Sequence, residues 1–276
     1  MKKLICIVML SLIYCLGIGQ VAEASKSKEE RKKTPSCTLY FVRHGKTMLN
    51  TSDRAQGWID APLTPSGVEV AKSLGRGLTK VKFDAVYSSD SGRAIETTKR
   101  LLKNANQKAL IKKLQQDARL REFNFGTYEG MMNEEMWLIA AENRKMTLEE
   151  LKEKKGQDSL ISTIQLLSNS LAELDQENEK KDQTFPAETF EKVESRLEKV
   201  LTKIVKQAQK NKQKNILIVS HGMSIATILH KIAPDVRLPD TGLKNASVSM
   251  VKVERGKCQV ESVNDLSFIK KGEKLK

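Results

Sequence analysis

Short apolar runs and longer amphipathic stretches alternate along the chain. The runs at residues 39–42, 85–87 and 216–219 are apolar, rich in β-branched or aromatic side chains and followed by turn formers, which predicts buried strands. A further strand is expected at residues 109–114. Strands that alternate with helices at this spacing are typical of βαβ units. The pattern therefore predicts an α/β fold with a mainly parallel central sheet flanked by helices.

Helix signals occupy the stretches between these strands. Thr64 is a good N-cap and Pro65 suits the first helical position, so a helix is expected to run to about Leu78. Residues 190–209 place apolar side chains on one face and lysines on the other, which predicts a long amphipathic helix. Two more helices are expected from about residue 91 to 102 and from about 224 to 232.

Two further segments complete the predicted architecture. Residues 130–185 show helical periodicity and dense charge without a strand signal, which predicts a helical cap insertion. Residues 248–254 and 259–263 flank a turn at residues 255–257, which predicts a C-terminal antiparallel hairpin. The whole domain is expected to span residues 37–270.

The N-terminus resembles a targeting signal. Met1-Lys2-Lys3 precedes an apolar segment that reaches residue 18, and Ala22-Glu23-Ala24 follows, which is the order of a secretory signal peptide with cleavage after Ala24. An uncleaved membrane anchor is the alternative. We assign residues 1–24 to a signal peptide and residues 25–36 to a charged linker. The protein is therefore expected to be secreted or associated with the cell envelope.

Composition and charge limit the classes of partner. Hydrophobic residues make up 39% of the 276 residues, as in a globular protein. The 48 Lys and Arg exceed the 34 Asp and Glu, and the formal net charge of +14 suits anionic partners such as phosphorylated substrates or acidic envelope polymers. Because the lysines are spread along the chain, an ordinary solvated surface explains the charge as well, and we expect no specific nucleic-acid partner. The oligomeric state is not determined by the sequence.

Two of the four cysteines would remain after cleavage of the signal peptide. Cys37 lies just before the first strand and Cys258 begins the second arm of the hairpin. If the hairpin borders the first strand antiparallel, the two sulfurs approach each other and an exported protein would form a disulfide. The alternative is two unpaired thiols. Three histidines and these two cysteines lack the close spacing of metal ligands, so no metal site is expected.

The candidate chemistry lies where two predicted strands end. Arg43-His44-Gly45 follows the first strand, and His221-Gly222 follows the strand at residues 216–219. If these strands are neighbours in a parallel sheet, both imidazoles emerge at the same edge, where α/β proteins bind ligands. Two histidines and an arginine at one edge predict an anion site.

Five short sequence blocks that contain or surround these residues follow one another along the chain. They are Arg43-His44-Gly45 with Thr47 and Asn50, Gln56-Gly57 with Pro62-Leu63-Thr64 and Gly67, Ser88-Ser89 with Arg93-Ala94 and Thr97, residues 120–126 with Glu129-Gly130, and Ser220-His221-Gly222. In these blocks the chain resembles the histidine phosphatase superfamily, which has the phosphoglycerate-mutase-like fold. The resemblance implies a metal-independent phosphomonoester hydrolase that needs no cofactor and acts on a small phosphorylated substrate.

The resemblance assigns the reacting groups. His44 would be the nucleophile that accepts the phosphoryl group as phosphohistidine. His221 would donate to the phosphoryl oxygens, and its positive charge would favour the transition state. Glu122 would be the general acid that protonates the leaving oxygen and then activates water. Glu129 lies in the same predicted loop and is the rival for this role.

The same resemblance assigns the phosphate pocket. Arg43 and Arg93 offer planar donors suited to phosphate oxygens. Asn50, Gln56 and Gly57 would line the pocket through side-chain and backbone donors. His44, Arg43, Arg93, Glu122 and His221 would thus carry the chemistry.

Some features leave alternatives open. Many family members carry a Gly-Glu-Ser block before the last helix that leads into the second His-Gly strand, whereas this chain has Pro186-Ala187-Glu188-Thr189. His230 has no partner motif and is expected to have no catalytic role. The alternatives to an exported hydrolase are a phosphoglycerate mutase, which shares these residues, and a non-enzymatic protein that binds anions in the same pocket.

Overall fold

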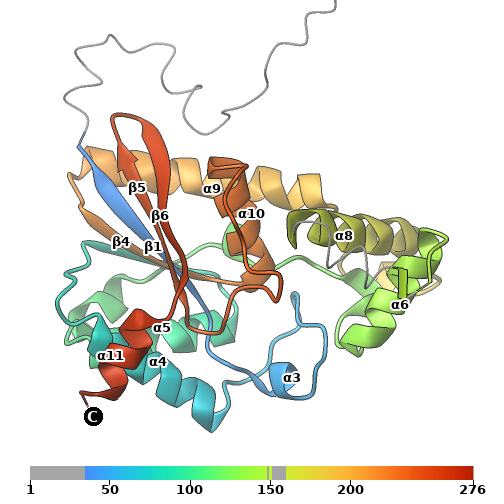
Figure 1. Ribbon diagram of the computed structural model, residues 1–276, viewed down its shortest axis with the longest axis horizontal. Helices are drawn as coiled ribbons and strands as arrows, with labels where there is room; N and C mark the ends of the chain where they lie inside the picture. The colour runs from blue at the N-terminus through green and yellow to red at the C-terminus, as the bar shows by residue number, and fades with distance from the viewer. Residues whose placement is uncertain (1–34, 148, 151–159, 276) are drawn as a thin grey trace, which may run out of the picture.

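The computed structural model of the protein describes residues 35–147, 149–150 and 160–275. The predicted signal peptide and residues 25–34 of the predicted linker lie outside the described residues. The described chain forms a central sheet covered by helices on both faces, and two helices lie to one side of it (Figure 1). Among the helices in these described ranges, none is long and apolar enough to cross a membrane.

The sheet has six strands in the order β3-β2-β4-β1-β5-β6. The strands are β1 Cys37–Arg43, β2 Ala85–Ser88, β3 Gln115–Gln116, β4 Asn215–Ser220, β5 Val248–Glu254 and β6 Lys257–Asp265. The first four strands in this order pair parallel, whereas β5 runs antiparallel to β1 and β6 runs antiparallel to β5. The predicted fold class is confirmed, including the C-terminal hairpin along the first strand.

The helices agree closely with their sequence signals. They are α3 Met48–Thr51, α4 Pro65–Gly77, α5 Gly92–Asn104, α6 Asn133–Asn143, α8 Leu160–Glu177, α9 Phe190–Lys210, α10 Gly222–Ile232 and α11 Ser267–Glu273, with 3-10 helices η1 Lys108–Lys113, η2 Ala118–Leu120, η3 Gly126–Tyr128 and η4 Lys181–Gln183. Thr64 caps α4 as expected, since its side chain accepts a hydrogen bond from the Gly67 amide.

The two faces of the sheet pack into separate apolar clusters. Along β4, Ile216 and Ile218 point to one face and contact the cluster that contains α8, α9 and α10. Leu217 and Val219 point to the other face and contact the cluster that contains α4, α5 and α11. Because successive strand side chains alternate between faces, a strand buried on both sides must be apolar throughout. This is why residues 216–219 are an unbroken apolar run.

The prediction of a strand at residues 109–114 is wrong. Residues 108–113 form the 3-10 helix η1, and β3 is only the dipeptide Gln115–Gln116, which pairs with the end of β2. In the helical turn Leu110 and Ile111, followed by Leu114, pack against the cluster under α4 and α5, while Lys112 and Lys113 stay exposed. A short run with four apolar residues fits either structure, and here packing against the helices decides.

The segment predicted as a cap contains α6 and α8 in its described part, and residues 148 and 151–159 lie outside the described residues. The two helices pack on each other and lie at one end of the molecule (Figure 1). Ile164, Leu167 and Leu171 of α8 are buried in the same cluster as Val193 of α9. The cap helices are therefore anchored to the core rather than held by their loops alone.

The disulfide considered between Cys37 and Cys258 is not formed. Both cysteines pair with Val253, one from each side of β5, so two strand spacings separate them. That is about 9–10 Å, beyond the roughly 4.4–6.8 Å between Cα atoms that a disulfide spans. Burial raises the pKa of each thiol to about 11. The hairpin does border the first strand antiparallel, but the two thiols are unpaired.

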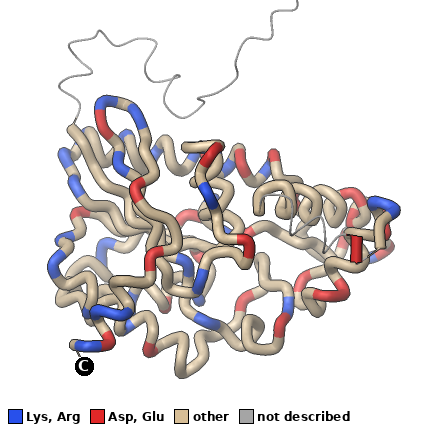
Figure 2. Tube along the Cα trace, in the orientation of Figure 1, with Lys and Arg blue, Asp and Glu red and all other residues tan. Residues whose placement is uncertain are grey.

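In the view of Figure 2, Lys and Arg occur along most described elements, whereas the end of the molecule with α6 is marked mainly by Asp and Glu. Several of these charges pair locally, such as Arg76 with Glu69 and Arg100 with Glu96. Exposed pairs of this kind contribute little to stability. This distribution agrees with the sequence, in which the lysines are spread rather than clustered.

Candidate active site

The two His-Gly pairs meet at one edge of the sheet. Arg43 pairs with Ser220 at the ends of the parallel neighbours β1 and β4, so His44 and His221 leave the sheet side by side. Their ring centroids are 5.2 Å apart, and the His44 amide donates to the Ser220 carbonyl at 3.0 Å. Gly45 is required because a Cβ there would lie 2.8 Å from the Gly67 carbonyl oxygen. The convergence expected from the sequence is present.

His44 is held in one tautomer. Its Nδ1 lies 2.8 Å from the Gly45 carbonyl oxygen. A carbonyl can only accept, so Nδ1 carries the proton and Nε2 has a free lone pair. The side chain is 4% exposed. Burial, followed by the charges of Arg93 and Arg43, lowers the pKa of His44 well below its usual value. The imidazole is therefore neutral and its Nε2 is nucleophilic.

His221 is held in the opposite tautomer. Its Nδ1 lies 3.0 Å from Nη2 of Arg93, and a guanidinium can only donate, so the proton of His221 is on Nε2. Burial and the charge of Arg93 lower the pKa of His221 well below the usual value. His221 is therefore a neutral donor. The positive charge that the sequence interpretation gave it is disfavoured by burial first and then by the neighbouring charges, of which that of Arg93 is the largest.

Both arginines are held by hydrogen bonds to the protein, Arg93 by several and Arg43 by one. Arg93 is 1% exposed and donates to the carbonyls of Ile59 at 2.9 Å and Gly57 at 2.7 Å and to the carboxylate of Asp60 at 3.0 Å. Arg43 donates through Nη1 to the Leu243 carbonyl. These contacts fix both guanidinium groups in place. Because both Nη atoms of Arg93 are engaged, Arg93 does not offer two free Nη donors for bidentate binding of a phosphate.

Four buried donors of the site have no acceptor among the described residues. They are Nε of Arg43, Nε of Arg93, Nε2 of Gln56 and Nε2 of His221. A buried donor without an acceptor costs about 1–3 kcal/mol, so several at one place require an explanation. All four belong to residues assigned to the phosphate pocket from the sequence. A phosphoryl group offers only acceptors, so it is the kind of ligand that donors of this type would suit.

The loop after β1 holds Gln56 and Asn50 through Thr47. Thr47 caps α3 and donates from Oγ1 to Oε1 of Gln56 at 2.6 Å, which fixes the orientation of that amide. Oδ1 of Asn50 accepts from the Thr47 amide at 3.3 Å and from Nδ2 of Asn245 at 3.3 Å. Because both amide oxygens are engaged, the NH₂ groups of Gln56 and Asn50 are the ends that remain for an anion.

Gly57 does not have the role expected of it. Its amide donates to Glu129 at 3.1 Å and its carbonyl accepts from Arg93, so its backbone offers no donor to a ligand. It is also absent from the lining of the cavity beside His44. A Cβ at Gly57 would lie 2.1 Å from the Phe123 carbonyl oxygen. Glycine is needed here so that two loops can pack closely.

Glu122 lies at the N-terminus of α10. One carboxylate oxygen accepts from the Met223 amide at 2.9 Å, and the other accepts from the amide and the hydroxyl of Ser224, each at 2.9 Å. The helix N-terminus favours negative charge at this place. Glu122 is 6% exposed and its exposed part lines the cavity beside His44.

Glu129 holds two loops together through hydrogen bonds to backbone amides. Its carboxylate accepts from the amides of Gly57, Trp58, Ile59 and Phe125, at 2.7–3.2 Å. Burial raises its pKa, while the four amides act in the opposite direction. Glu129 does not line the cavity beside His44. The geometry therefore favours Glu122 over Glu129 as the acid of the site.

A buried ion pair that the sequence interpretation missed holds the Glu122 loop. Arg196 of α9 donates to the carbonyls of Arg119, Arg121 and Glu122, each at 2.8 Å. It also forms two hydrogen bonds with Glu188, at 2.9 and 2.8 Å. Glu188 belongs to the block that departs from the family pattern, yet its carboxylate is 4% exposed and fully engaged. One feature of the sequence could have indicated this ion pair: Arg196 is the single arginine among the lysines of α9.

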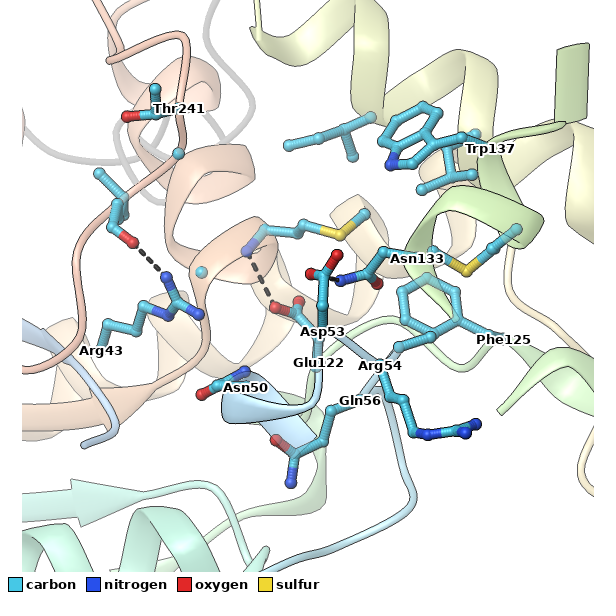
Figure 3. Close-up of a pocket in the computed structure, with 18 of the residues that line it drawn as sticks. Arg43, Asn50, Asp53, Arg54, Gln56, Glu122, Phe125, Asn133, Trp137 and Thr241 are labelled. Atoms are coloured by element: carbon cyan, nitrogen blue, oxygen red, sulfur yellow. Dashed lines mark hydrogen bonds between the residues drawn. The ribbon is translucent and has the colours of Figure 1, made fainter. Parts of the chain in front are cut away.

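These groups surround a cavity of about 620 Å³ (Figure 3). Of the residues predicted from the sequence, Arg43, His44, Asn50, Gln56 and Glu122 line it, whereas Arg93 and His221 do not. The cap, the loops and α10 supply lining residues that were not predicted: Asp53, Arg54, Phe125, Asn133, Glu134, Met136, Trp137, Leu160, Ile164, Leu167, Met223, Thr241 and Leu243. In the described part of the chain, no three His, Cys, Asp or Glu side chains are grouped to hold a metal ion.

Comparison with known proteins agrees with this geometry. The family model of the histidine phosphatase superfamily, branch 1, matches residues 39–163 and 145–266. The chain belongs to this superfamily. A solved structure of phosphoglycerate mutase from Bacillus anthracis str. Sterne is 38% identical, covers 88% of this chain and 99% of its own, and superposes with a TM-score of 0.77.

Relatives with other activities match as well. The putative phosphoserine phosphatase 2 of Hydrogenobacter thermophilus is 28% identical over 231 residues, which is 83% of this chain and 95% of the relative. The fructose-2,6-bisphosphatase TIGAR of Xenopus laevis is 40% identical over 103 residues, only 37% of each chain. Phosphatases and phosphoglycerate mutases are thus both among its relatives.

The lowered pKa values of His44 and His221 predict a pH dependence of stability. In the unfolded chain both imidazoles titrate near 6.5, so below that pH the unfolded state binds more protons than the folded state. The free energy of unfolding should therefore fall as the pH is lowered through 6.5. We expect ¹⁵N NMR shifts of neutral imidazoles at a pH of about 6 and a declining melting temperature below it. Protonated rings in the folded protein at that pH would contradict the prediction.

Proposed function

We propose that the protein is a phosphomonoester hydrolase that works through a phosphohistidine on His44. One observation carries the proposal: a buried, neutral imidazole with a free Nε2 lone pair lies beside several buried donors that lack acceptors. A nucleophile of this kind among fixed cationic and N–H donors suits attack on an electron-poor centre that bears anionic oxygens. Membership of the superfamily supports a phosphoryl group as that centre.

The reaction would proceed in two displacements. Nε2 of His44 forms a bond to phosphorus while the bond from phosphorus to the leaving oxygen breaks, and Glu122 gives that oxygen a proton. Water then attacks the phosphohistidine, Glu122 takes the proton from the water, and the nitrogen–phosphorus bond breaks to release phosphate. Arg43, Arg93 and His221 would stabilise charge on the phosphoryl oxygens through donors that the protein already holds in place.

We propose that no metal is needed, because the fixed guanidinium groups supply the positive charge that a metal would otherwise bring. Arg43 is pinned by the Leu243 carbonyl, and Arg93 by Asp60 and two further carbonyls. Preorganised donors of this kind require little rearrangement during reaction.

Phosphoglycerate mutase activity is the second candidate, and the similarity to the Bacillus anthracis structure favours it. A mutase must return the phosphoryl group to its substrate before water removes it. Among the described residues that line the cavity, Arg54 is the one cation besides Arg43, and it donates to the Gly130 carbonyl, so this part of the lining offers no free cation for a carboxylate on the substrate. Phosphoglycerate isomerisation that outpaces phosphate release would select the mutase.

Export remains part of the proposal. It is supported by the basic, apolar and small residues of positions 1–24. We expect the mature protein, recovered from the medium or the cell surface, to begin at Ser25 by N-terminal sequencing. A protein that begins at Met1 in the cytoplasmic fraction would contradict export.

Replacement of the nucleophile tests the mechanism. His44→Ala should lower kcat for an aryl phosphate by about 10³-fold or more, with chelator present throughout. Acid-labile phosphate should be trapped on the wild-type protein and not on this variant. His230→Ala is the matched control, because His230 lies in the last turn of α10 and does not line the cavity. Activity that survives His44→Ala would refute the mechanism, and the absence of any turnover would favour an anion-binding protein.

Replacement of the acid tests the assignment of Glu122. Glu122→Gln should lower kcat for alkyl phosphates by about 10²–10⁴-fold, because an alkoxide leaves only when it is protonated. An aryl phosphate with an acidic phenol should still phosphorylate His44, so phosphohistidine should accumulate in a burst. Glu135→Gln, an exposed residue of α6, is the control. If both substrate types lose activity equally and no burst appears, Glu122 is not the acid.

A further inference from the structure

The cavity beside His44 has two chemically different ends. Arg43, His44, Asn50 and Gln56 lie at the end near the sheet. The opposite end is apolar and is built by Met136 and Trp137 of α6, Leu160, Ile164 and Leu167 of α8, and Met223 of α10. Figure 3 shows Arg43 and Trp137 on opposite sides with Glu122 between them. A phosphoryl group at the first end would place its leaving group toward the second.

A second recess adjoins the apolar end. A recess of about 150 Å³ is lined by five of the same side chains, those of Trp137, Leu160, Ile164, Leu167 and Met223, together with Thr163 and residues 240–242. Apolar surface that faces a cavity gains free energy when an apolar ligand covers it. The length of the apolar wall therefore suits more than a two-carbon or three-carbon leaving group.

Met223 connects this wall to the proposed acid. Its amide donates to the Glu122 carboxylate at 2.9 Å, and its side chain lines both the cavity and the recess. The leaving oxygen must lie beside Glu122 to receive a proton. The carbon chain attached to that oxygen therefore starts next to Met223 and is directed along the apolar wall.

The charges of the described part of the lining disfavour an anionic leaving group. Asp53, Glu122 and Glu134 contribute carboxylates, and Asp53 accepts from Asn133 at 2.6 Å. Arg54 is the one cation that the described lining offers besides Arg43, and Figure 3 shows its guanidinium directed away from Trp137. A second carboxylate or phosphate on the substrate would meet like charge or apolar surface.

From these observations we infer that the leaving group of the substrate is uncharged and hydrophobic, either an aromatic ring or an alkyl chain of several carbons. The inference rests on the proposed phosphohydrolase function and names its class of substrate. Serine and glycerate leaving groups are small and charged and would leave the apolar wall uncovered.

A series of primary alkyl phosphates isolates this effect. Ethyl, butyl and hexyl phosphate have leaving groups of nearly equal basicity, so differences in kcat/KM report contacts with the leaving group rather than reactivity. Each buried methylene should raise kcat/KM by about two- to fourfold, the upper value corresponding to about 0.8 kcal/mol. Phosphoserine and 3-phosphoglycerate should have lower kcat/KM than hexyl phosphate.

Replacing side chains of the apolar wall should make log kcat/KM rise less steeply with the number of carbons in the leaving group. Trp137→Ala and Met223→Ala test the wall from two different helices, so that a folding defect in α6 cannot account for both. Leu138→Ala is the matched control, since Leu138 is the neighbour of Trp137, is 41% exposed and does not line the cavity. It should retain the wild-type slope. Circular dichroism should confirm that each variant is folded.

The outcomes separate the two proposals. If no phosphate ester is hydrolysed, the proposed function fails. If ethyl phosphate and hexyl phosphate are hydrolysed with equal kcat/KM, or if phosphoserine or 3-phosphoglycerate is preferred, the function stands and the hydrophobic leaving group is refuted. A slope that Trp137→Ala and Met223→Ala both leave unchanged would also refute it.

Discussion

The parallel pairing of β1 with β4 in one register is the constraint on which the site depends. Arg43 lies opposite Ser220, so the residues that follow them emerge together, with the imidazole rings 5.2 Å apart. A slip of one residue would shift one ring by about 3.3 Å along the strand and exchange the two faces of β4. Both faces are packed against different helices, which fixes the register. The packing of the core thus fixes the relative positions of His44 and His221.

Burial, followed by the charges of the nearby arginines, sets the protonation of the two histidines. Arg43 and Arg93 stand beside them, and the guanidinium of Arg93 is compensated by Asp60 and by backbone carbonyls. Together with burial, these charges keep both imidazoles neutral. The charges that would attract a phosphoryl anion therefore also leave His44 unprotonated and able to attack. A bound anion would offset the arginines and make protonation of His221 less unfavourable.

Buried carboxylates organise the loops around the site. The Glu129 carboxylate accepts hydrogen bonds from four backbone amides of two loops. Glu188 pairs with Arg196, which in turn donates to backbone carbonyls of the loop that contains Glu122. Asp175 of α8 accepts from the Thr127 and Ala187 amides, at 2.8 and 2.9 Å, and so ties a cap helix to the same loop. The cap side of the cavity is thereby joined to the loop that carries Glu122.

The sequence alone predicted the strand ends, most helix starts and the candidate residues that meet at the edge of the sheet, because periodicity, capping and the Arg-His-Gly and His-Gly blocks are local signals. It could not separate a strand from a 3-10 helix at residues 109–114, since both bury the same apolar residues. The engaged amide of Gly57, the distance between Cys37 and Cys258, and the tautomers of the histidines depend on contacts between segments far apart in the chain. Only the tertiary structure decided these, because a hydrogen bond or a strand spacing exists only once both partners are placed.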